Sequence, residues 1–184
     1  IFGKPNAGKS TLLNALIGEK MAIVSHKVQT TRHRIKAFLN GEHYQIIFSD
    51  TPGIIEPKYR LHQKMMSEVK SALEDSDVAL LLYDLTDKDL VAADELFSSL
   101  RLKVPAILLC NKADVAGPEA VNEALVFFKE KKYAKEVLAI SALKKAGIDE
   151  LVSLVLKYLP EGMAFYNEDD LSDLPTKFFV SELI

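Results

Sequence analysis

The chain has 184 residues, of which 48% are hydrophobic and 27% charged, and its net charge is −3. This balance is typical of one compact domain and excludes a disordered or low-complexity chain. The slight negative charge argues against a general nucleic-acid binder, because such domains carry a clustered basic excess. One cysteine, Cys110, excludes an internal disulfide, and no apolar stretch approaches the ~20 residues of a membrane span.

The first motif in the chain is GKPNAGKST, which matches G-x-x-x-x-G-K-S/T. Its glycines permit backbone angles that turn N–H groups inward onto phosphate oxygens. In such a loop Lys9 would reach the β- and γ-phosphates of a nucleoside triphosphate, and Ser10 would offer its hydroxyl to Mg²⁺. The expected phosphate-binding residues are Gly3, Lys4, Pro5, Asn6, Ala7, Gly8, Lys9, Ser10 and Thr11. The alternative is a glycine-rich turn that merely starts a helix.

Hydrophobic spacing after the motif predicts the first elements. Leu12, Leu13 and Leu16 lie at helical spacing, and Gly18 stands where the helix would end. Only two apolar residues precede Gly3, so we expect a strand there that is cut short. Residues 34–40 and 43–49 read as strands on either side of Asn40-Gly41, a hairpin signal, and should run antiparallel.

The second half alternates buried strands with amphipathic helices. Residues 78–85 and 104–110 are continuous apolar runs, as expected of parallel strands covered on both faces. Helical patterns occupy residues 61–73, 89–100, 119–131 and 148–159. The order predicts an α/β fold with three layers.

A second motif, DTPG, directly follows the strand at residues 43–49. The carboxylate of Asp50 can hold Mg²⁺ through water, and the N–H of Gly53 can contact a γ-phosphate. A contact that exists only with the triphosphate is what a nucleotide switch requires. A simple Pro-Gly turn is the alternative reading.

A third motif, NKAD, ends the apolar run at residues 104–110. Asp114 can accept two hydrogen bonds from the N1–H and N2 amino groups of guanine, and Asn111 can read the O6/N7 edge. Adenine would leave Asp114 unpaired, at a cost of roughly 1–3 kcal/mol or more. We therefore expect Asn111, Lys112 and Asp114 to select guanine, although four polar residues after a strand are a weak signal alone.

Together these residues resemble the Era-type GTPases of the translation-factor-related P-loop class. The runs GKPNAGKSTLLNAL, VQTTRHRI, FSDTPGI, LLCNKAD and ISAL stand in that family's order and spacing over essentially the whole chain. The resemblance implies that Thr31 is the switch threonine that closes over Mg²⁺ and the γ-phosphate, with Thr30 as the alternative. It also implies that Ser141, Ala142 and Leu143 support the guanine.

The same resemblance implies a P-loop GTPase domain at residues 1–160, with a mostly parallel six-stranded sheet and one antiparallel strand. Residues 161–184 would form an acidic linker and the beginning of a C-terminal KH-type RNA-binding domain. The implied partners are GTP or GDP with Mg²⁺, and small-subunit ribosomal RNA and the 30S subunit, bound through that KH domain. Cytoplasmic localisation is expected, and the family has been linked with peripheral association at the inner membrane.

The implied activity is a slow hydrolysis of GTP, in which Lys9, Thr31 and Gly53 are the catalytic residues and Ser10, Thr31 and Asp50 serve the metal. Ras-like GTPases carry a water-orienting glutamine directly after the glycine of DTPG, where this chain has Ile54. We therefore expect turnover on the order of 10⁻⁴–10⁻² per second. A potassium ion at Asn6 is a further hypothesis from the family, and a simple turn residue is the alternative.

Three functions fit these features. The first is a GTP-hydrolysing switch in small-subunit assembly, and the second is a related GTPase that acts on tRNA modification or the large subunit. The third is an ATP-dependent kinase or a nucleotide-binding scaffold without turnover, against which NKAD argues. The sequence gives no oligomeric state and no activating or exchange factor.

Overall fold

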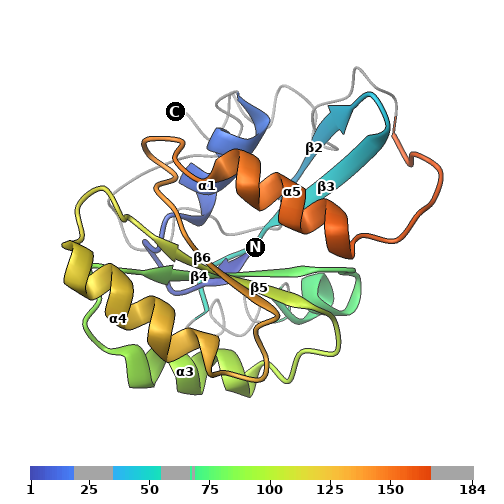
Figure 1. Ribbon diagram of the computed structural model, residues 1–184. Helices are drawn as coiled ribbons and strands as arrows, with labels where there is room; N and C mark the ends of the chain where they lie inside the picture. The colour runs from blue at the N-terminus through green and yellow to red at the C-terminus, as the bar shows by residue number, and fades with distance from the viewer. Residues whose placement is uncertain (19–34, 55–66, 68, 167–184) are drawn as a thin grey trace, which may run out of the picture.

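The computed structural model of the protein describes residues 1–18, 35–54, 67 and 69–166 (Figure 1). In chain order the elements are β1 (Phe2–Gly3), α1 (Lys9–Ile17), β2 (Ile35–Gly41), β3 (Tyr44–Asp50), β4 (Ala79–Asp84), α3 (Leu90–Ser99), β5 (Ala106–Asn111), α4 (Pro118–Lys129), β6 (Glu136–Ala139) and α5 (Ile148–Tyr158). Residues 69–74 are also helical and belong to the helix expected at 61–73. The expected elements are thus confirmed wherever the structure describes them.

The strands form a four-stranded parallel sheet in the order β1-β4-β5-β6 and a separate antiparallel pair, β2-β3. The α/β class is confirmed, but the six strands are divided between two sheets where a single sheet was expected. Among the described residues, β1 pairs with β4 and no ladder joins it to β3. Hydrogen bonds still cross this boundary, from the Ile1 backbone nitrogen to the Ser49 carbonyl at 2.7 Å and from the Ile54 N–H to the Gly3 carbonyl at 2.9 Å.

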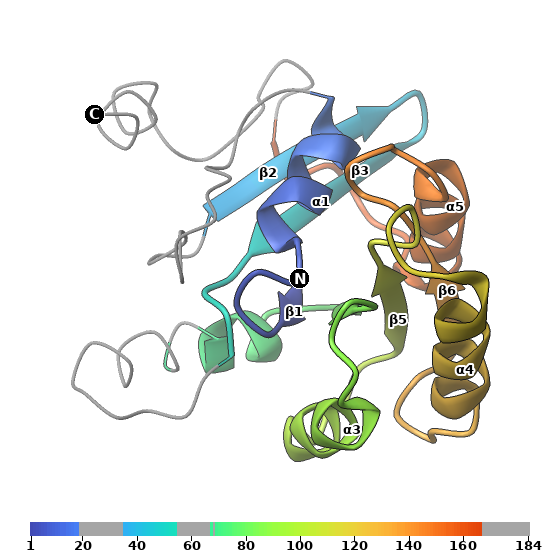
Figure 2. The same ribbon diagram turned by 90° about the vertical axis from the view of Figure 1, so that its left-hand side faces the viewer.

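Helices cover both faces of the parallel sheet, with α1 and α5 on one side and α3 and α4 on the other (Figures 1 and 2). Alternation along each strand divides the apolar side chains between two cores. In β5, for example, Ile107 and Leu109 face the core beneath α1 and α5, while Leu108 and Cys110 face the core above α3 and α4. The three-layer arrangement follows from this alternation.

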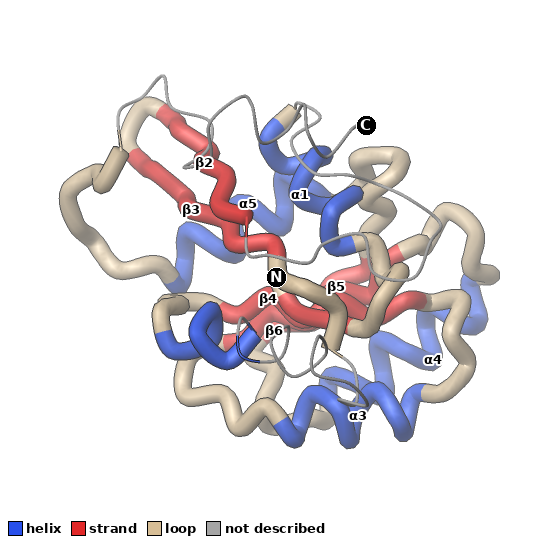
Figure 3. Tube along the Cα trace, turned by 180° about the vertical axis from the view of Figure 1, so that it is seen from behind, coloured by secondary structure: helices blue, strands red, loops and turns tan. Residues whose placement is uncertain are grey.

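The hairpin β2-β3 extends from the parallel sheet, as the view from behind shows (Figure 3). Its antiparallel pairing is confirmed, but its turn consists of Glu42 and His43, two residues later than the Asn40-Gly41 signal indicated. Gly41 is instead the last residue of β2, and the ring of Tyr44 lies where a side chain at Gly41 would stand.

Local sequence sets the helix ends. Gly18 ends α1 in the left-handed conformation (φ 79°), and its N–H donates to the carbonyl of Asn14. Asp89 caps α3 by accepting a hydrogen bond from the N–H of Ala92, and Pro118 begins α4. Among the described residues, no helix has the length and apolar character needed to cross a bilayer.

The parallel sheet brings the functional segments to one edge. The carboxyl ends of β4 and β5 lie side by side, since Asp84 pairs with Asn111. The phosphate loop follows β1, which pairs with β4 on its other side. Ligands of such sheets bind outside the carboxyl ends of the strands, where the phosphate loop and NKAD therefore meet. DTPG follows β3 of the separate hairpin, and the hydrogen bond from the Ile54 N–H to the Gly3 carbonyl joins it to the phosphate loop.

Candidate nucleotide-binding site

The phosphate loop runs from β1 into α1 in a conformation that depends on its glycines. Gly8 has φ 98°, a left-handed angle, and a side chain there would collide with the amide of Asn111. A Cβ on Gly3 would lie 2.5 Å from the carbonyl oxygen of Leu82 in β4. The loop is therefore packed tightly between β4 and the NKAD segment. Asn6, exposed at its tip, also has a positive φ of 62°.

Lys9 begins α1, and its side chain folds back along the loop. The side chain is buried, and its ammonium donates to the carbonyls of Gly3 at 3.1 Å and Lys4 at 2.9 Å. Burial lowers the pKa of Lys9 to about 8, and the neighbouring carboxylate of Asp50 opposes part of this shift. A positive charge is thus held at the amino end of a helix, a setting that favours an anion.

Ser10 and Asp50 form the part of the site suited to a metal ion. The Ser10 hydroxyl donates to Asp50 Oδ2 at 2.7 Å, and both residues are buried. Hydroxyl and carboxylate oxygens are hard ligands of the kind that Mg²⁺ prefers, so the donor set fits this ion. The neighbouring Thr51 is also buried and donates its hydroxyl to the carbonyl of Ile1 at 2.7 Å, which fixes the start of the DTPG segment.

The DTPG segment lies directly against the phosphate loop. A Cβ on Gly53 would lie 2.8 Å from the backbone nitrogen of Pro5, so only glycine fits this approach. Ile54 is buried in the core beside α3 and α4. The residue in the water-orienting position therefore has neither a polar group nor an exposed side chain.

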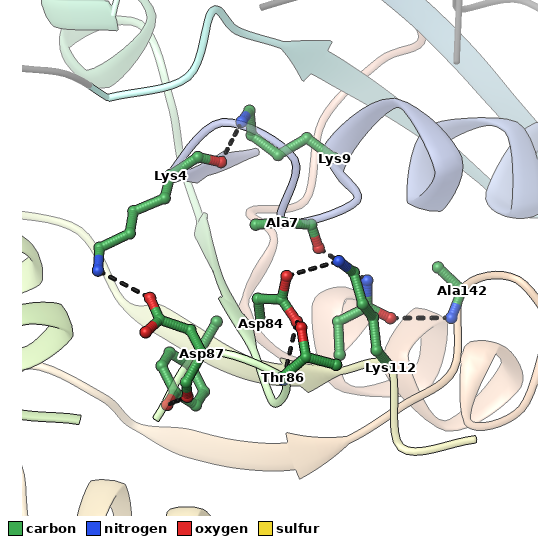
Figure 4. A network of polar contacts seen from close by, with 10 residues as sticks. Lys4, Ala7, Lys9, Asp84, Thr86, Asp87, Lys112 and Ala142 are labelled. Carbon is green, nitrogen blue, oxygen red and sulfur yellow. Dashed lines mark hydrogen bonds and ion pairs between the residues drawn. The ribbon is translucent and has the colours of Figure 1, made fainter. Parts of the chain in front are cut away.

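Asn111 ties the phosphate loop to the base-reading segments. Its Nδ2 donates to the carbonyl of Ala7 at 2.9 Å, and its Oδ1 accepts from the N–H of Ala142 at 3.0 Å (Figure 4). The side chain is 2% exposed. One amide thus joins three segments that are distant in the sequence.

Asp114, the last residue of NKAD, is exposed to solvent. Its Oδ1 accepts a hydrogen bond from the Ser141 hydroxyl at 2.6 Å, and the same hydroxyl oxygen accepts from the N–H of Lys144 at 3.1 Å. Ala142 is buried, whereas the side chain of Leu143 is 70% exposed. The segment at 141–143 therefore orients Asp114 and leaves it open to a ligand.

Two acidic residues that the sequence motifs did not indicate also belong to this region. Lys112 donates to Asp84 Oδ2 at 2.5 Å, and Lys4 donates to Asp87 Oδ2 at 2.8 Å (Figure 4). The signal that could have found them is their position at the end of β4 and just beyond it, at the carboxyl edge of the sheet.

The structure thus brings together the expected residues of the phosphate loop, DTPG, NKAD and the 141–143 segment. Thr30 and Thr31, the switch candidates, lie outside the described residues, as do the run from Gln29 to Arg34 and residues 167–184.

Comparisons with known proteins identify the family of this chain. The sequence profile of the family described as "50S ribosome-binding GTPase" matches residues 1–112. GTPase Era of Clostridium botulinum (strain Eklund 17B / Type B) is 43% identical over the whole chain. This chain spans 63% of the length of that relative.

Solved structures of Era show the same architecture. One, in complex with MgGDPNP and nucleotides 1506–1542 of 16S ribosomal RNA, aligns with 99% of this chain and 63% of its own at a TM-score of 0.93 and 42% identity. Another, a variant of Aquifex aeolicus Era bound to GDP and AlF4⁻, aligns over the same shares at a TM-score of 0.92 and 41% identity. The resemblance to Era-type GTPases is confirmed, and the chain belongs to the family of 50S ribosome-binding GTPases.

Proposed function

We propose that this chain is the GTP-binding domain of a GTPase that hydrolyses GTP to GDP and phosphate and acts in assembly of the small ribosomal subunit. The observation that carries the proposal is the contact of Asn111 with both Ala7 and Ala142, since it places a base-reading loop directly beside a phosphate loop. A kinase or a simple scaffold would not need a carboxylate that selects guanine.

Base selection rests on Asp114. Its carboxylate is exposed and is oriented by Ser141, so it can accept both the N1–H and the N2 amino group of guanine. Adenine offers no such pair of donors, and the charged group would then lose its partners in the complex. GTP and GDP are therefore the proposed ligands.

The negative charge that develops in phosphoryl transfer is proposed to be neutralised by Lys9 and by Mg²⁺ held at Ser10 and Asp50. Lys9 stands where it can exchange two backbone carbonyls for phosphate oxygens, and Ser10 and Asp50 would hold Mg²⁺. When bound, Mg²⁺ supplies neutralisation of the charge that develops on the phosphoryl oxygens. Thr31 and the N–H of Gly53 are proposed to contact the γ-phosphate side.

We also propose that the hydrolysis of GTP is slow. The burial of Ile54 removes it as a group that could orient a water, and its N–H is occupied by the carbonyl of Gly3. Hydrolysis would then rely on charge stabilisation alone, which fits a rate on the order of 10⁻⁴–10⁻² per second. Asn6, exposed with φ 62°, is the residue proposed to help hold a potassium ion, and an equal rate in sodium would contradict this.

The ribosomal RNA partner is proposed from the relatives. Era binds a fragment of 16S ribosomal RNA in a solved complex, and that chain is longer than this one. We propose that residues 1–160 form the GTPase domain and that residues 161–184 lead into a KH-type domain that binds the RNA and the 30S subunit. Peripheral membrane association stays a prediction from the resemblance.

The proposed function is tested with the full-length protein carrying Asp114→Asn. The amide offers guanine a donor where it needs an acceptor, so GTP binding should fall by about tenfold or more while xanthosine triphosphate is accepted. Binding and phosphate release are measured with both nucleotides. Glu123→Gln, which removes an exposed carboxylate on α4, is the matched control and should behave like wild type.

Three results would contradict the proposal. Equal binding of ATP and GTP by the wild type would show that Asp114 does not select the base. Unchanged GTP binding in Asp114→Asn would show the same. Absence of phosphate release even with small subunits present would favour the scaffold.

A further inference from the structure

The loop between β4 and α3 reaches both halves of the nucleotide site. Its first residue, Asp84, ends β4 and pairs in the sheet with Asn111, which ends β5. The ladder continues one step further, because the N–H of Leu85 donates to the carbonyl of Asn111 at 3.0 Å. The loop and the NKAD segment therefore leave the sheet side by side.

The carboxylate of Asp84 is held by three donors. Its Oδ1 accepts from the N–H of Thr86 at 2.9 Å and from the hydroxyl of Thr86 at 2.6 Å. Its Oδ2 accepts from the ammonium of Lys112 at 2.5 Å (Figure 4). Lys112 itself has a left-handed backbone, with φ 69°, which is unusual for a side chain of this size. Asp84 thus fixes the side chain of a residue in the base-reading loop.

Asp87 holds a lysine of the phosphate loop in the same way that Asp84 holds Lys112 of the base-reading loop. Its Oδ2 accepts from Lys4 at 2.8 Å, its Oδ1 from the N–H of Asp89 at 3.1 Å, and its carbonyl from the buried Tyr83 hydroxyl. The bond from Lys4 holds the pKa of Asp87 below its usual range. The carbonyl of Lys4 in turn accepts from Lys9. A chain of contacts therefore runs from the core through Asp87 to the lysine of the phosphate loop.

We propose that Asp84 and Asp87 are positioning residues of the nucleotide site: Asp84 sets the base-reading loop through Lys112, and Asp87 sets the phosphate loop through Lys4. The inference rests on the proposed GTP binding. A carboxylate beside a site for a polyanion would repel the ligand, but here each one is paired with a lysine and so adds little net charge.

The test uses full-length protein loaded with a fluorescent GDP, whose dissociation rate is measured. Asp87→Asn keeps the shape of the side chain but removes the ion pair, and we expect GDP to leave about three- to tenfold faster. Asp87→Glu, which can still reach Lys4, should restore most of the slow release. Asp84→Asn should also accelerate release, and its effect should multiply with that of Asp87→Asn because the two act on different loops.

The matched control is Asp94→Asn. Asp94 accepts from Lys131 at 2.6 Å, and the two side chains are each 24% exposed, so it forms a comparable pair away from the site. This variant should release GDP at the wild-type rate even where the midpoint of thermal unfolding falls, which separates positioning from stability.

A second comparison tests whether Asp87 acts through Lys4. Lys4→Met and the double variant Lys4→Met/Asp87→Asn should release GDP as fast as Asp87→Asn alone, since all three lack the same pair. Multiplied effects in the double variant, or wild-type release from Asp87→Asn, would overturn this inference while leaving the proposed function intact. A wild-type protein that bound no GDP would overturn the proposed function and this inference with it.

Discussion

At the residue scale, the protonation state of Lys9 decides how strongly the site attracts an anion. Burial penalises the ammonium and lowers the pKa of Lys9 to about 8, against 10.5 for an exposed lysine. Between these values the unfolded chain holds more protons, so the free energy of unfolding rises with pH across this window. The cost of the buried ammonium is therefore fully present at neutral pH and is lost progressively between pH 8 and pH 10.5.

The affinity for nucleotide should fall as the pH rises, whereas the free energy of unfolding rises. Phosphate oxygens favour the charged Lys9, so binding above pH 8 requires the uptake of a proton, and the affinity for GDP should fall by about fourfold between pH 7 and pH 8.5. Calorimetry in two buffers of different ionisation enthalpy measures the proton directly, and this range stays below the ionisation of guanine itself. Equal affinities without proton uptake would contradict the role given to Lys9.

At the element scale, the hairpin β2-β3 holds the segment that follows α5, which runs back to the hairpin in Figure 1. The amide of Gln45 accepts from the N–H groups of Phe165 at 2.9 Å and Tyr166 at 3.0 Å, and donates to the carbonyl of Tyr166 at 3.0 Å and to Asn40 Oδ1 at 2.8 Å. The ring of Tyr166 stacks on Phe38 with centroids 4.0 Å apart. All hydrogen-bonding capacity of this side chain is in use.

Replacing Gln45 by glutamate should release this segment. The carboxylate keeps the two acceptors but faces the carbonyl of Tyr166 and Asn40 Oδ1 with no donor. The amides of Phe165 and Tyr166 should then exchange about three- to tenfold faster, as measured by hydrogen exchange. Glu42→Gln, at the turn of the same hairpin, is the control, and equal exchange in both variants would show that the amide does not hold the segment.

The hairpin also shows where sequence patterns suffice. Alternation and apolar runs located β2, β3, β4 and β5, because these signals are local. The turn lies at Glu42 and His43, where the Asn40-Gly41 signal did not place it, and β6 has four half-buried residues with no distinctive pattern. The pairing of Lys4 with Asp87 joins residues 83 positions apart, and no local pattern encodes it.

At the scale of the whole molecule, the central strands serve two cores at once. Leu108 and Leu109 are both fully buried, but they face opposite sides of the sheet. Neither core can lose its contacts without disturbing the strand that supplies the other. Unfolding should therefore be a single cooperative transition.

Alanine substitutions test this coupling. Leu108→Ala and Leu109→Ala should each lower the free energy of unfolding by about 2–5 kcal/mol through the lost contacts and the cavity left behind. Denaturation followed by circular dichroism and by loss of GDP binding should coincide in both variants. Val126→Ala, on the 55% exposed side chain of Val126, should stay within about 0.5 kcal/mol of wild type. Separate transitions by the two probes would show that the cores melt independently.

The hydrogen bonds of the Asn111 amide have a consequence for the folding of the protein and for its resistance to proteolysis in the cell. Its bonds to Ala7 and Ala142 join residues that lie 104 and 31 positions away, so the nucleotide site is complete only when the chain from Ala7 to Ala142 has folded together. A nascent or damaged chain in which these contacts have not formed would lack the nucleotide site. Because a ligand stabilises only the form that binds it, cellular guanine nucleotide would protect molecules in which these segments have folded together from proteolysis and leave the others exposed.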